Sequence, residues 1–298
     1  MIEKRTSTLS TPDVDLVYDV RGPLPTTDGQ PPLLMAGHPM AAEGFETLAG
    51  YFGDRTVVTY DPRGTGRSIR KDGRADRTPE LHTADLHALI AHLGAGPVDL
   101  FASSGGAVNA LALVASYPDD VRTLVAHEPP LLALLPDADR AFAAERQVQE
   151  AYHAKGFGAG MAGFIVMTSW QGELTDEYAA RPMPDPAQFG LPTADDGSRD
   201  DPLLSGTANA ITNYRLDIDA IRAAPTRVVI GVGVESGQNI TGRTSAAAAA
   251  ALTLPLAQFP SHHGGFMGGE HGYAGQPAEF AARLRDVLDG DGDDPKTK

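Results

Sequence analysis

The stretch Ala102-Ser103-Ser104-Gly105-Gly106 follows an apolar run at residues 98–101 and precedes a helix-like stretch at 107–116. A strand that turns this abruptly into a helix needs small residues two positions before and after the tip, because larger side chains would collide. Alanine and glycine occupy those positions around Ser104, whereas centring the turn on the preceding serine would place a phenylalanine at one flank. We therefore predict a strand–turn–helix with Ser104 at its tip, where its hydroxyl lies at a helix N-terminus.

Short apolar runs alternate with longer helical patterns along the rest of the chain. The runs fall at residues 33–35, 56–60, 98–101, 121–126, 227–232 and 256–259, and the helical patterns at 80–93, 107–116 and 277–288. This alternation is typical of an α/β fold, a mostly parallel sheet with helices on both faces. The apolar/polar alternation at residues 14–20 favours an antiparallel strand at the edge of that sheet, and the alanine run at 246–251 favours a further helix.

The alternation breaks after two consecutive prolines, Pro129 and Pro130. We predict a helical lid at residues 130–213, inserted into an α/β core formed by 1–129 and 214–298, with an unstructured tail at 289–298. The lid segment has little charge where it carries three large apolar side chains, namely Phe164, Met167 and the single tryptophan, Trp170. They either pack the lid's own small core or face down as the roof of an apolar substrate pocket.

The bulk properties exclude several classes of function. The 298 residues suit one large α/β domain with an insertion, and a formal net charge of -15 argues against a nucleic-acid partner. Without cysteine, the chain offers neither a thiolate nucleophile nor a cysteine-built metal site. No apolar stretch is long enough for a signal sequence or a membrane span, so we expect a cytoplasmic protein that acts on a small molecule. The oligomeric state is left open, a homo-oligomer included.

A serine hydroxyl needs a general base within hydrogen-bond reach and a carboxylate to orient that base. The segment Pro260-Ser261-His262-His263-Gly264-Gly265 follows the last predicted strand, so a histidine there can reach over the turn at Ser104. His263 is favoured over its neighbour His262, because the two glycines after it leave room for the ring to turn inwards. His271, farther along the same loop, is the third candidate.

Two glutamates at predicted strand ends are candidates for the orienting acid. Glu128 is followed by two prolines, which stiffen the chain and suit a fixed pose, whereas Glu235 precedes a polar turn in which a solvated glutamate would be unremarkable. The pair His127-Glu128 is not a zinc-binding helix motif, because no second histidine follows at helical spacing and prolines forbid a helix. We predict no metal and no cofactor.

An oxyanion formed at Ser104 would need two N–H donors. One is expected from Gly105, directly after the serine, and the other from the loop after the strand at residues 33–35. Pro39 in that loop has no N–H to donate, so His38 is favoured and Met40 is the reserve.

Four ordered motifs resemble those of the α/β-hydrolase superfamily, from about residue 14 to residue 288. They are the Gly37-His38-Pro39 loop, the turn Asp61-Pro62-Arg63-Gly64-Thr65-Gly66-Arg67-Ser68, the turn at Ser104, and His263 before a helix with Pro277 and Phe280. The resemblance to lidded serine hydrolases implies a mostly parallel eight-stranded sheet flanked by helices, with a helical lid inserted after the sixth strand. It also implies that Asp61 and Arg63 are structural.

The chain departs from the usual pattern of that superfamily in two places. The loop Ala36-Gly37-His38-Pro39 lacks the histidine that ordinarily precedes the glycine, and no aspartate stands near residues 232–240, where the acid is usually found. In a minority of the superfamily, including the zearalenone-type lactone hydrolases, the acid follows the strand after the nucleophile's helix. Glu128, twenty-four residues beyond Ser104, is similar to that arrangement and ranks before Glu235.

The motifs together favour a serine hydrolase with an oxyanion hole and a lid, cleaving a carboxylic ester or lactone of a small to medium apolar substrate. In that reading Ser104 attacks, His263 takes its proton and an acyl-enzyme forms. The same triad could instead serve an acyltransferase, a perhydrolase or a carbon–carbon bond hydrolase. A hydrolase-like protein that binds an apolar ligand without turnover is the alternative from another class.

Overall fold

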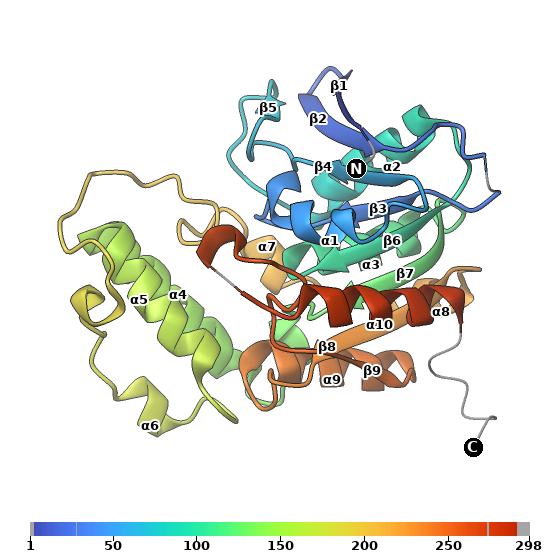
Figure 1. Cartoon of the computed structure of the whole chain (residues 1–298). Helices are drawn as coiled ribbons and strands as arrows, with labels where there is room; N and C mark the ends of the chain where they lie inside the picture. The colour runs from blue at the N-terminus through green and yellow to red at the C-terminus, as the bar shows by residue number, and fades with distance from the viewer. Residues whose placement is uncertain (1–2, 28, 273, 291–298) are drawn as a thin grey trace.

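The computed structural model describes residues 3–27, 29–272 and 274–290, and a sheet of nine strands forms the centre of this part of the chain (Figure 1). Its main path runs β1-β2-β4-β3-β6-β7-β8-β9, and β5 pairs with β2 beside that path. The pairings from β4 to β9 are parallel, whereas β2 pairs antiparallel with β1, β4 and β5. The strands are β1 (Lys4–Ser10), β2 (Val14–Arg21), β3 (Leu33–Ala36), β4 (Val57–Tyr60), β5 (Ile69–Arg70), β6 (Val98–Ser103), β7 (Val121–His127), β8 (Arg227–Gly233) and β9 (Leu256–Phe259).

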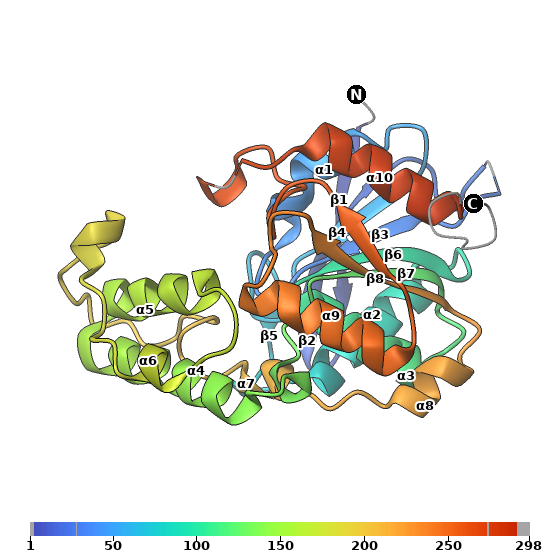
Figure 2. The ribbon, with the colours of Figure 1, turned by 90° about the horizontal axis from the view of Figure 1, so that it is seen from below.

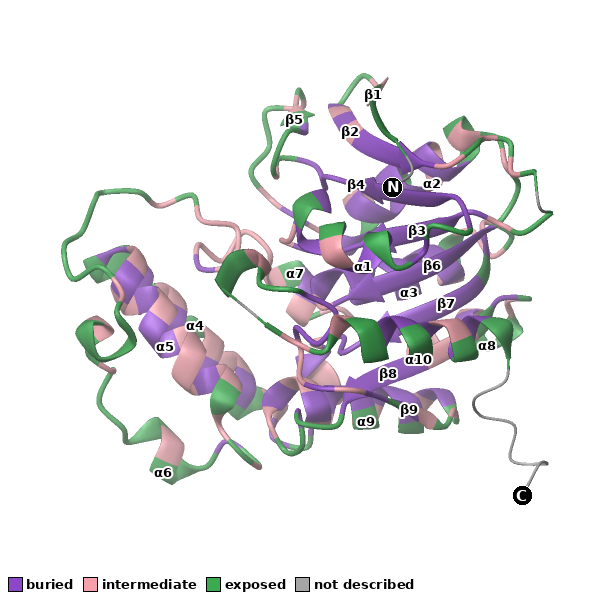
Figure 3. Ribbon diagram, viewed as in Figure 1, coloured by how far each residue is buried: buried purple, intermediate pink, exposed green. Residues whose placement is uncertain are grey.

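The mostly parallel α/β sheet is confirmed, with two differences in detail. The eight strands of the main path match the predicted number, and β5 is a two-residue addition. The strand predicted at the edge is β2, which lies inside the sheet, because β1 pairs with it over seven residues from Lys4↔Arg21 to Ser10↔Asp15. Six of the seven β1 residues are exposed, so no apolar alternation marks this strand in the sequence (Figure 3).

Helices cover both faces of the sheet (Figure 2). Four of them, α2, α3, α8 and α9, share one apolar cluster with the sheet, and α1 and α10 share another on the opposite face. Successive residues of β6 divide between the two clusters, since Leu100 and Ala102 belong to the first and Phe101 to the second. The helices are α1 (Glu46–Gly50), α2 (Pro79–Leu93), α3 (Gly105–Ser116), α8 (Ile218–Ala223), α9 (Ile240–Leu252) and α10 (Pro277–Asp289), and a 3₁₀ turn, η1 (Ala42–Phe45), precedes α1.

Residues 128–226 lie between β7 and β8, and we call them the inserted segment. Figures 1 and 2 both show its helices α4, α5 and α6 standing apart from the sheet. The α4 and α5 helices pack on each other around an apolar cluster that includes Val148, Tyr152 and Leu204. This segment contains the stretch predicted as a lid at 130–213, and its action as a lid stays a prediction. Its elements are η2 (Leu132–Leu134), α4 (Ala138–Lys155), α5 (Phe157–Ser169), α6 (Asp176–Ala179), η3 (Pro186–Phe189), α7 (Asn209–Thr212) and α8, which packs on the sheet.

The end of the described chain is helical. Asp289 is the last residue of α10, and Gly290 caps the helix with a φ of 88°. The tail predicted at 289–298 therefore begins inside α10, and its residues 291–298 lie outside the described residues. Among the described residues no helix combines the length and the apolar character that crossing a membrane would require.

Candidate active site

Ser104 lies at the tip of the turn between β6 and α3, as the small residues around it predicted. Its backbone has φ 57° and ψ -133°, a strained conformation for a residue with a side chain, and its N–H donates to the carbonyl of His127 at 2.9 Å. A Cβ atom on Gly106 would lie 2.6 Å from the Ala36 carbonyl oxygen, so no larger residue fits there. Ser104 itself is half-buried, which leaves part of its surface open at the end of the sheet.

Glu128 is the first residue after β7, and its side chain is fully buried. Its Oε1 accepts from the Gly233 N–H at 2.8 Å and from the Ser236 hydroxyl, and its Oε2 accepts from the Thr241 hydroxyl at 2.6 Å and from His263 Nδ1 at 2.7 Å. Burial alone would raise the pKa of Glu128, but the hydrogen bond from His263 and the neighbouring donors hold that pKa below its usual range. Four donors therefore surround an ionised carboxylate.

His263 lies on the loop after β9 and reaches Glu128 through Nδ1. An ionised carboxylate can only accept, so the proton of this hydrogen bond belongs to Nδ1, and in the neutral form of imidazole the lone pair is then on Nε2. The side chain is 39% exposed, and the loop turns tightly because the Gly265 N–H donates to the His262 carbonyl at 2.8 Å. A Cβ on Gly265 would lie 2.6 Å from the Pro260 carbonyl oxygen, which explains the glycine after this histidine pair.

The other candidates for base and acid point to different partners. His262 Nε2 lies 3.4 Å from the Ala274 carbonyl oxygen, and His271 Nε2 lies 3.7 Å from Glu43 Oε1. Glu235 is exposed, and the hydrogen bond that holds it runs from its backbone N–H to the Ser261 carbonyl at 3.0 Å. The structure thus brings Glu128 and His263 together, and it does not bring Glu235 to either of them.

Ser104 and Glu128 end neighbouring strands at the same edge of the sheet. In the parallel register Ser103 pairs with His127 and His127 with Gly231, so the next residues, Ser104 and Glu128, stand side by side. Among the described residues, no hydrogen bond joins the Ser104 hydroxyl to His263. In unliganded enzymes this contact is often long and tightens only when substrate binds.

The loop after β3 lies directly against the N-terminus of α3. A Cβ on Gly105 would come within 2.9 Å of the His38 carbonyl oxygen and 3.1 Å of His38 Nδ1, which shows how closely the two segments approach. Burial, and then the charge of Arg77, lower the pKa of His38 to about 3, so this ring is neutral near pH 7. The side chain of Met40, the reserve candidate, packs against Gly37 and Gly44.

Sequence reasoning missed the polar side chains that hold Glu128. Ser236 comes from the turn after β8 and Thr241 from the first turn of α9, a stretch whose polarity is equally typical of a solvated loop. It also missed a buried pair beneath the site, in which Ser103 Oγ lies 3.3 Å from His127 Nδ1. The His127 ring stacks near that of His263, with centroids 6.2 Å apart, and burial lowers the pKa of His127 to about 4.

The Asp61 to Ser68 turn makes contacts that hold the backbone. Asp61 accepts from the N–H groups of Ala42 at 2.9 Å and Arg67 at 2.8 Å, and the Ser68 hydroxyl donates to the Asp61 carbonyl at 2.7 Å. Arg63 donates to both carboxylate oxygens of Asp85 at 2.6 Å. These contacts fix the turn that follows β4.

The three apolar residues predicted to face the substrate pack within the inserted segment. Met167 is buried in its apolar cluster, and Phe164 and Trp170 pack against that cluster. The indole N–H of Trp170 donates to the Glu173 carbonyl at 3.0 Å, and its ring meets Tyr178 edge-on at 5.3 Å. These contacts match the interpretation in which the residues stabilise the segment itself, and their role in a substrate pocket stays a prediction.

The comparisons with known proteins agree on the fold. Residues 33–159 match the family model described as the alpha/beta hydrolase fold. The chain is 27% identical over 287 residues to the uncharacterized hydrolase YraK of Bacillus subtilis (strain 168), covering 95% of each protein. Two solved structures are similar over most of the chain: a thermophilic esterase of Thermogutta terrifontis with malate bound (23% identity, 98% and 100% of the two chains, TM-score 0.60) and the proline iminopeptidase of Mycobacterium smegmatis (18%, 96% and 98%, 0.62).

The strand order, the turn at Ser104 and these similarities define the fold. The chain has the α/β-hydrolase fold, and the family model and the relatives that it resembles support a hydrolase. The resemblance drawn from the sequence motifs is thereby confirmed at the level of the fold. The bond cleaved, the substrate and the role of each residue are the subject of the proposals below.

Proposed function

We propose that the chain is a serine hydrolase that cleaves a carboxylic ester or lactone through an acyl-enzyme, with Ser104 as nucleophile, His263 as base and Glu128 as orienting acid. The observation that carries this proposal is the 2.7 Å hydrogen bond between Glu128 Oε2 and His263 Nδ1 at the edge of the sheet where Ser104 lies. The exposure of Glu235 favours Glu128 as the acid.

The first half of the reaction follows from the protonation states. His263 Nε2, which carries the lone pair, takes the proton of the Ser104 hydroxyl as Oγ attacks the carbonyl carbon of the substrate. The ring then becomes a cation, and the Glu128 carboxylate beside Nδ1 stabilises that charge without taking the proton. His263 finally gives its proton to the leaving alcohol, and the acyl group stays on Ser104.

The developing oxyanion needs donors that are in place before the reaction. We assign this role to the backbone N–H groups of Gly105 and His38, because the loop after β3 touches the first residue of α3. Met40 remains the reserve donor on the same loop. In the second half of the reaction, His263 takes a proton from water as the water oxygen attacks the acyl carbon. His263 then returns that proton to Ser104 Oγ as the acyl–oxygen bond breaks, which releases the acid and restores the hydroxyl.

The inserted segment would cover the substrate in this proposal. It leaves the sheet directly after Glu128 and returns at β8, so it starts and ends at strands that border the site. Phe164, Met167 and Trp170 would act mainly by keeping this cover folded and docked, because they belong to or pack against an apolar cluster that also includes Ile240 of α9.

A fluorophosphonate probe tests the nucleophile directly, since it modifies only an activated serine. We expect one covalent adduct on the wild-type chain, mapped to Ser104 by peptide mass spectrometry, and none on Ser104→Ala. Ser103→Ala is the matched control, because Ser103 is the adjacent serine but is buried. The Ser103→Ala variant should still be labelled at Ser104. Labelling of Ser104→Ala, or full ester turnover by that variant, would overturn the assignment.

A further inference from the structure

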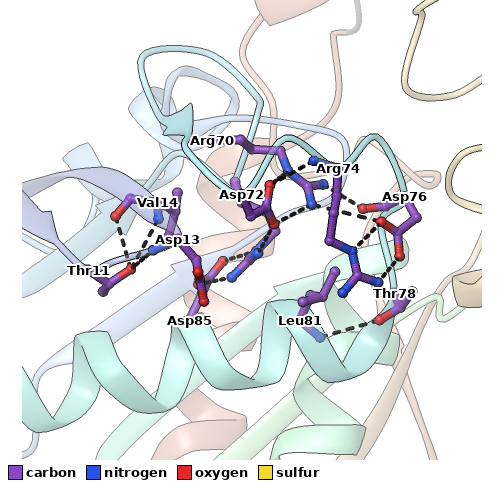
Figure 4. A network of polar contacts seen from close by, with 11 residues as sticks. Thr11, Asp13, Val14, Arg70, Asp72, Arg74, Asp76, Thr78, Leu81 and Asp85 are labelled. Atoms are coloured by element: carbon purple, nitrogen blue, oxygen red, sulfur yellow. Dashed lines mark hydrogen bonds and ion pairs between the residues drawn. The ribbon is translucent and has the colours of Figure 1, made fainter.

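Five arginines lie within residues 61–78, the segment between β4 and α2, and four of them have a carboxylate partner. Figure 4 shows two of these pairs, Arg70 with Asp72 and Arg74 with Asp76. The shortest nitrogen–oxygen distances of the four pairs are Arg63 to Asp85 at 2.6 Å, Arg67 to Asp61 at 2.7 Å, Arg70 to Asp72 at 2.7 Å and Arg74 to Asp76 at 2.5 Å. Ion pairing is therefore the rule for cations in this segment.

Arg77 is the exception, because no carboxylate among the described residues forms an ion pair with it. Its guanidinium donates to the carbonyls of Gly64 and Ala75, both at 3.3 Å, and to the Thr207 hydroxyl at 2.8 Å, while its buried Nε has no acceptor. The whole residue is only 9% exposed. A charge buried to this extent without a counter-charge is costly, so the folded chain holds a cation that lacks its natural partner.

The place of Arg77 connects this cation to the candidate active site. Arg77 stands directly before the N-cap of α2, and its side chain bridges Gly64, on the turn after β4, to Thr207 in the inserted segment. It thus lies at the carboxyl edge of the parallel strands, where ligands bind in α/β proteins. Its charge reaches His38, the loop residue that packs on Gly105.

The surroundings of Arg77 are polar: they include two neutral histidines, and two aspartates that lie beyond ion-pair distance. His82 packs edge-on against His38 at 4.7 Å between ring centroids, and both rings are buried and neutral. His82 Nδ1 and Nε2 and His38 Nε2 lack hydrogen-bond partners among the described residues. Asp200 and Asp201 attract Arg77 through space, but neither comes within ion-pair distance.

We propose that Arg77 is a specificity-determining residue, and that it selects substrates carrying a carboxylate in addition to the ester. The carboxylate would pair with the guanidinium while the ester carbonyl lies at Ser104. This inference rests on the proposed function and narrows its class of substrate. It favours esters with a carboxylate over the purely apolar esters that the sequence favoured. A free anion is otherwise repelled by a chain whose formal net charge is -15, so a local unpaired cation is needed to attract one.

Two pairs of substrates that differ in one charge test the proposal. Monoethyl succinate and ethyl butyrate place the difference on the acyl side, and O-acetylglycolate and ethyl acetate place it on the alcohol side. We expect the wild-type chain to prefer the anionic member of at least one pair in kcat/KM. Arg77→Gln, which keeps hydrogen-bond donors but loses the charge, should reduce that preference about 10- to 100-fold. Arg77→Lys should restore part of it.

Arg74→Gln is the matched control, since Arg74 lies in the same segment but is exposed and already paired with Asp76. It should leave the ratio of anionic to neutral turnover unchanged. An unchanged ratio in Arg77→Gln, or a wild-type chain that prefers the neutral member of both pairs, would overturn the proposal. Equal losses for both members of a pair would assign Arg77 to structure alone, which also overturns it.

A binding measurement separates this proposal from the assignment of the nucleophile. Ser104→Ala, which cannot form an acyl-enzyme, should still be stabilised against thermal unfolding by succinate, and the double variant Ser104→Ala/Arg77→Gln should lose that stabilisation. If the fluorophosphonate experiment fails while succinate binding depends on Arg77, the carboxylate site stands and the serine mechanism does not. No succinate binding to Ser104→Ala, together with no charge preference in turnover, removes the site.

Discussion

Two regions flank Ser104: in one a buried carboxylate has all its hydrogen bonds, although His127 Nε2 beside it has no partner among the described residues, and in the other several buried groups have none. On the β7 and β8 side, each oxygen of Glu128 accepts two hydrogen bonds, from Gly233 and Ser236 and from Thr241 and His263. On the α2 side, buried nitrogens of His38, His82 and Arg77, as well as the side-chain amide of Asn109, have no partner among the described residues. We call these the acid side and the open side.

The difference indicates two kinds of site. A carboxylate with four donors needs no ligand to hold its charge and its position, so the acid side is complete before substrate arrives. Unsatisfied buried groups cost free energy, and they are tolerated where a ligand or a water supplies the missing partner. The acid side therefore fixes the base, whereas the open side leaves polar groups unsatisfied until a partner arrives.

The largest loss of activity is expected from a substitution that disrupts the acid side. Glu128→Gln places an amide N–H₂ among donors and removes the charge that stabilises a protonated His263, so kcat/KM for a good ester substrate should fall about 10³- to 10⁴-fold. Glu235→Gln is the control and should stay within about twofold of the wild type, because surface changes of this kind have small effects. Steady-state kinetics at matched folding, checked by circular dichroism, decides between them. A comparable loss in Glu235→Gln would make Glu235 the acid.

The acid side also shows what the sequence could and could not predict. The roles of Ser104 and Gly106 could be predicted from the sequence because they are local: they depend on which residues fit one tight turn. The donors to Glu128 could not be predicted, since Thr241 meets it across a sequence separation of 113 residues and nothing in the polar start of α9 states which way that hydroxyl faces. Patterns of apolar residues predict where strands end, and the parallel sheet then brings those ends together.

The open side was beyond sequence reasoning for a different reason. Arg77 directly follows Asp76, which would be the obvious partner, yet that carboxylate pairs closely with Arg74. Which of several neighbouring charges pair is decided by side-chain geometry that composition does not record. The same holds for β1, whose polar residues form a strand only because β2 offers a free edge beside it.

A smaller effect is expected from removing one donor on the acid side. Thr241→Val deletes the hydroxyl that donates to Glu128 Oε2, so the free energy of unfolding should fall by about 2 kcal/mol near neutral pH. The pKa of Glu128, which is lowered in the folded state, should rise. The stability that this lowered pKa contributes is lost as the pH falls from the pKa of an unfolded glutamate towards the folded one, so in the variant the loss should be smaller and should end at a higher pH.

Urea unfolding over a series of acidic pH values measures both changes. Ser245→Ala is the matched control, because its hydroxyl lies one turn along the same helix and donates to the Thr241 carbonyl rather than to Glu128. The free energy of unfolding of Ser245→Ala should fall with pH as that of the wild type does over the acidic range. If Thr241→Val and the wild type lose the same amount of stability over the acidic range, the hydroxyl does not support the ionised carboxylate.

The smallest expected effect has the opposite sign and tests the open side. His82→Phe replaces a ring whose two nitrogens are buried without partners, so the variant should be more stable than the wild type by about 1 kcal/mol near neutral pH. The expected gain in stability lies at the low end of the usual cost of an unsatisfied buried polar group, because phenylalanine is slightly larger than the imidazole it replaces. Urea unfolding measures the difference, and the exposed His153→Phe is the control, expected to change stability by less than about 0.5 kcal/mol.

The pH dependence makes this last test sharper. Burial lowers the pKa of His82 in the folded state, so as the pH falls below about 6.5 the unfolded wild-type chain takes up a proton that the folded chain does not. The stability advantage of His82→Phe should therefore widen by about 1.4 kcal/mol per pH unit in that range. A variant that is instead less stable than the wild type would mean that water or a ligand already bonds to His82. The open side would then be as complete as the acid side, and the contrast between them would be lost.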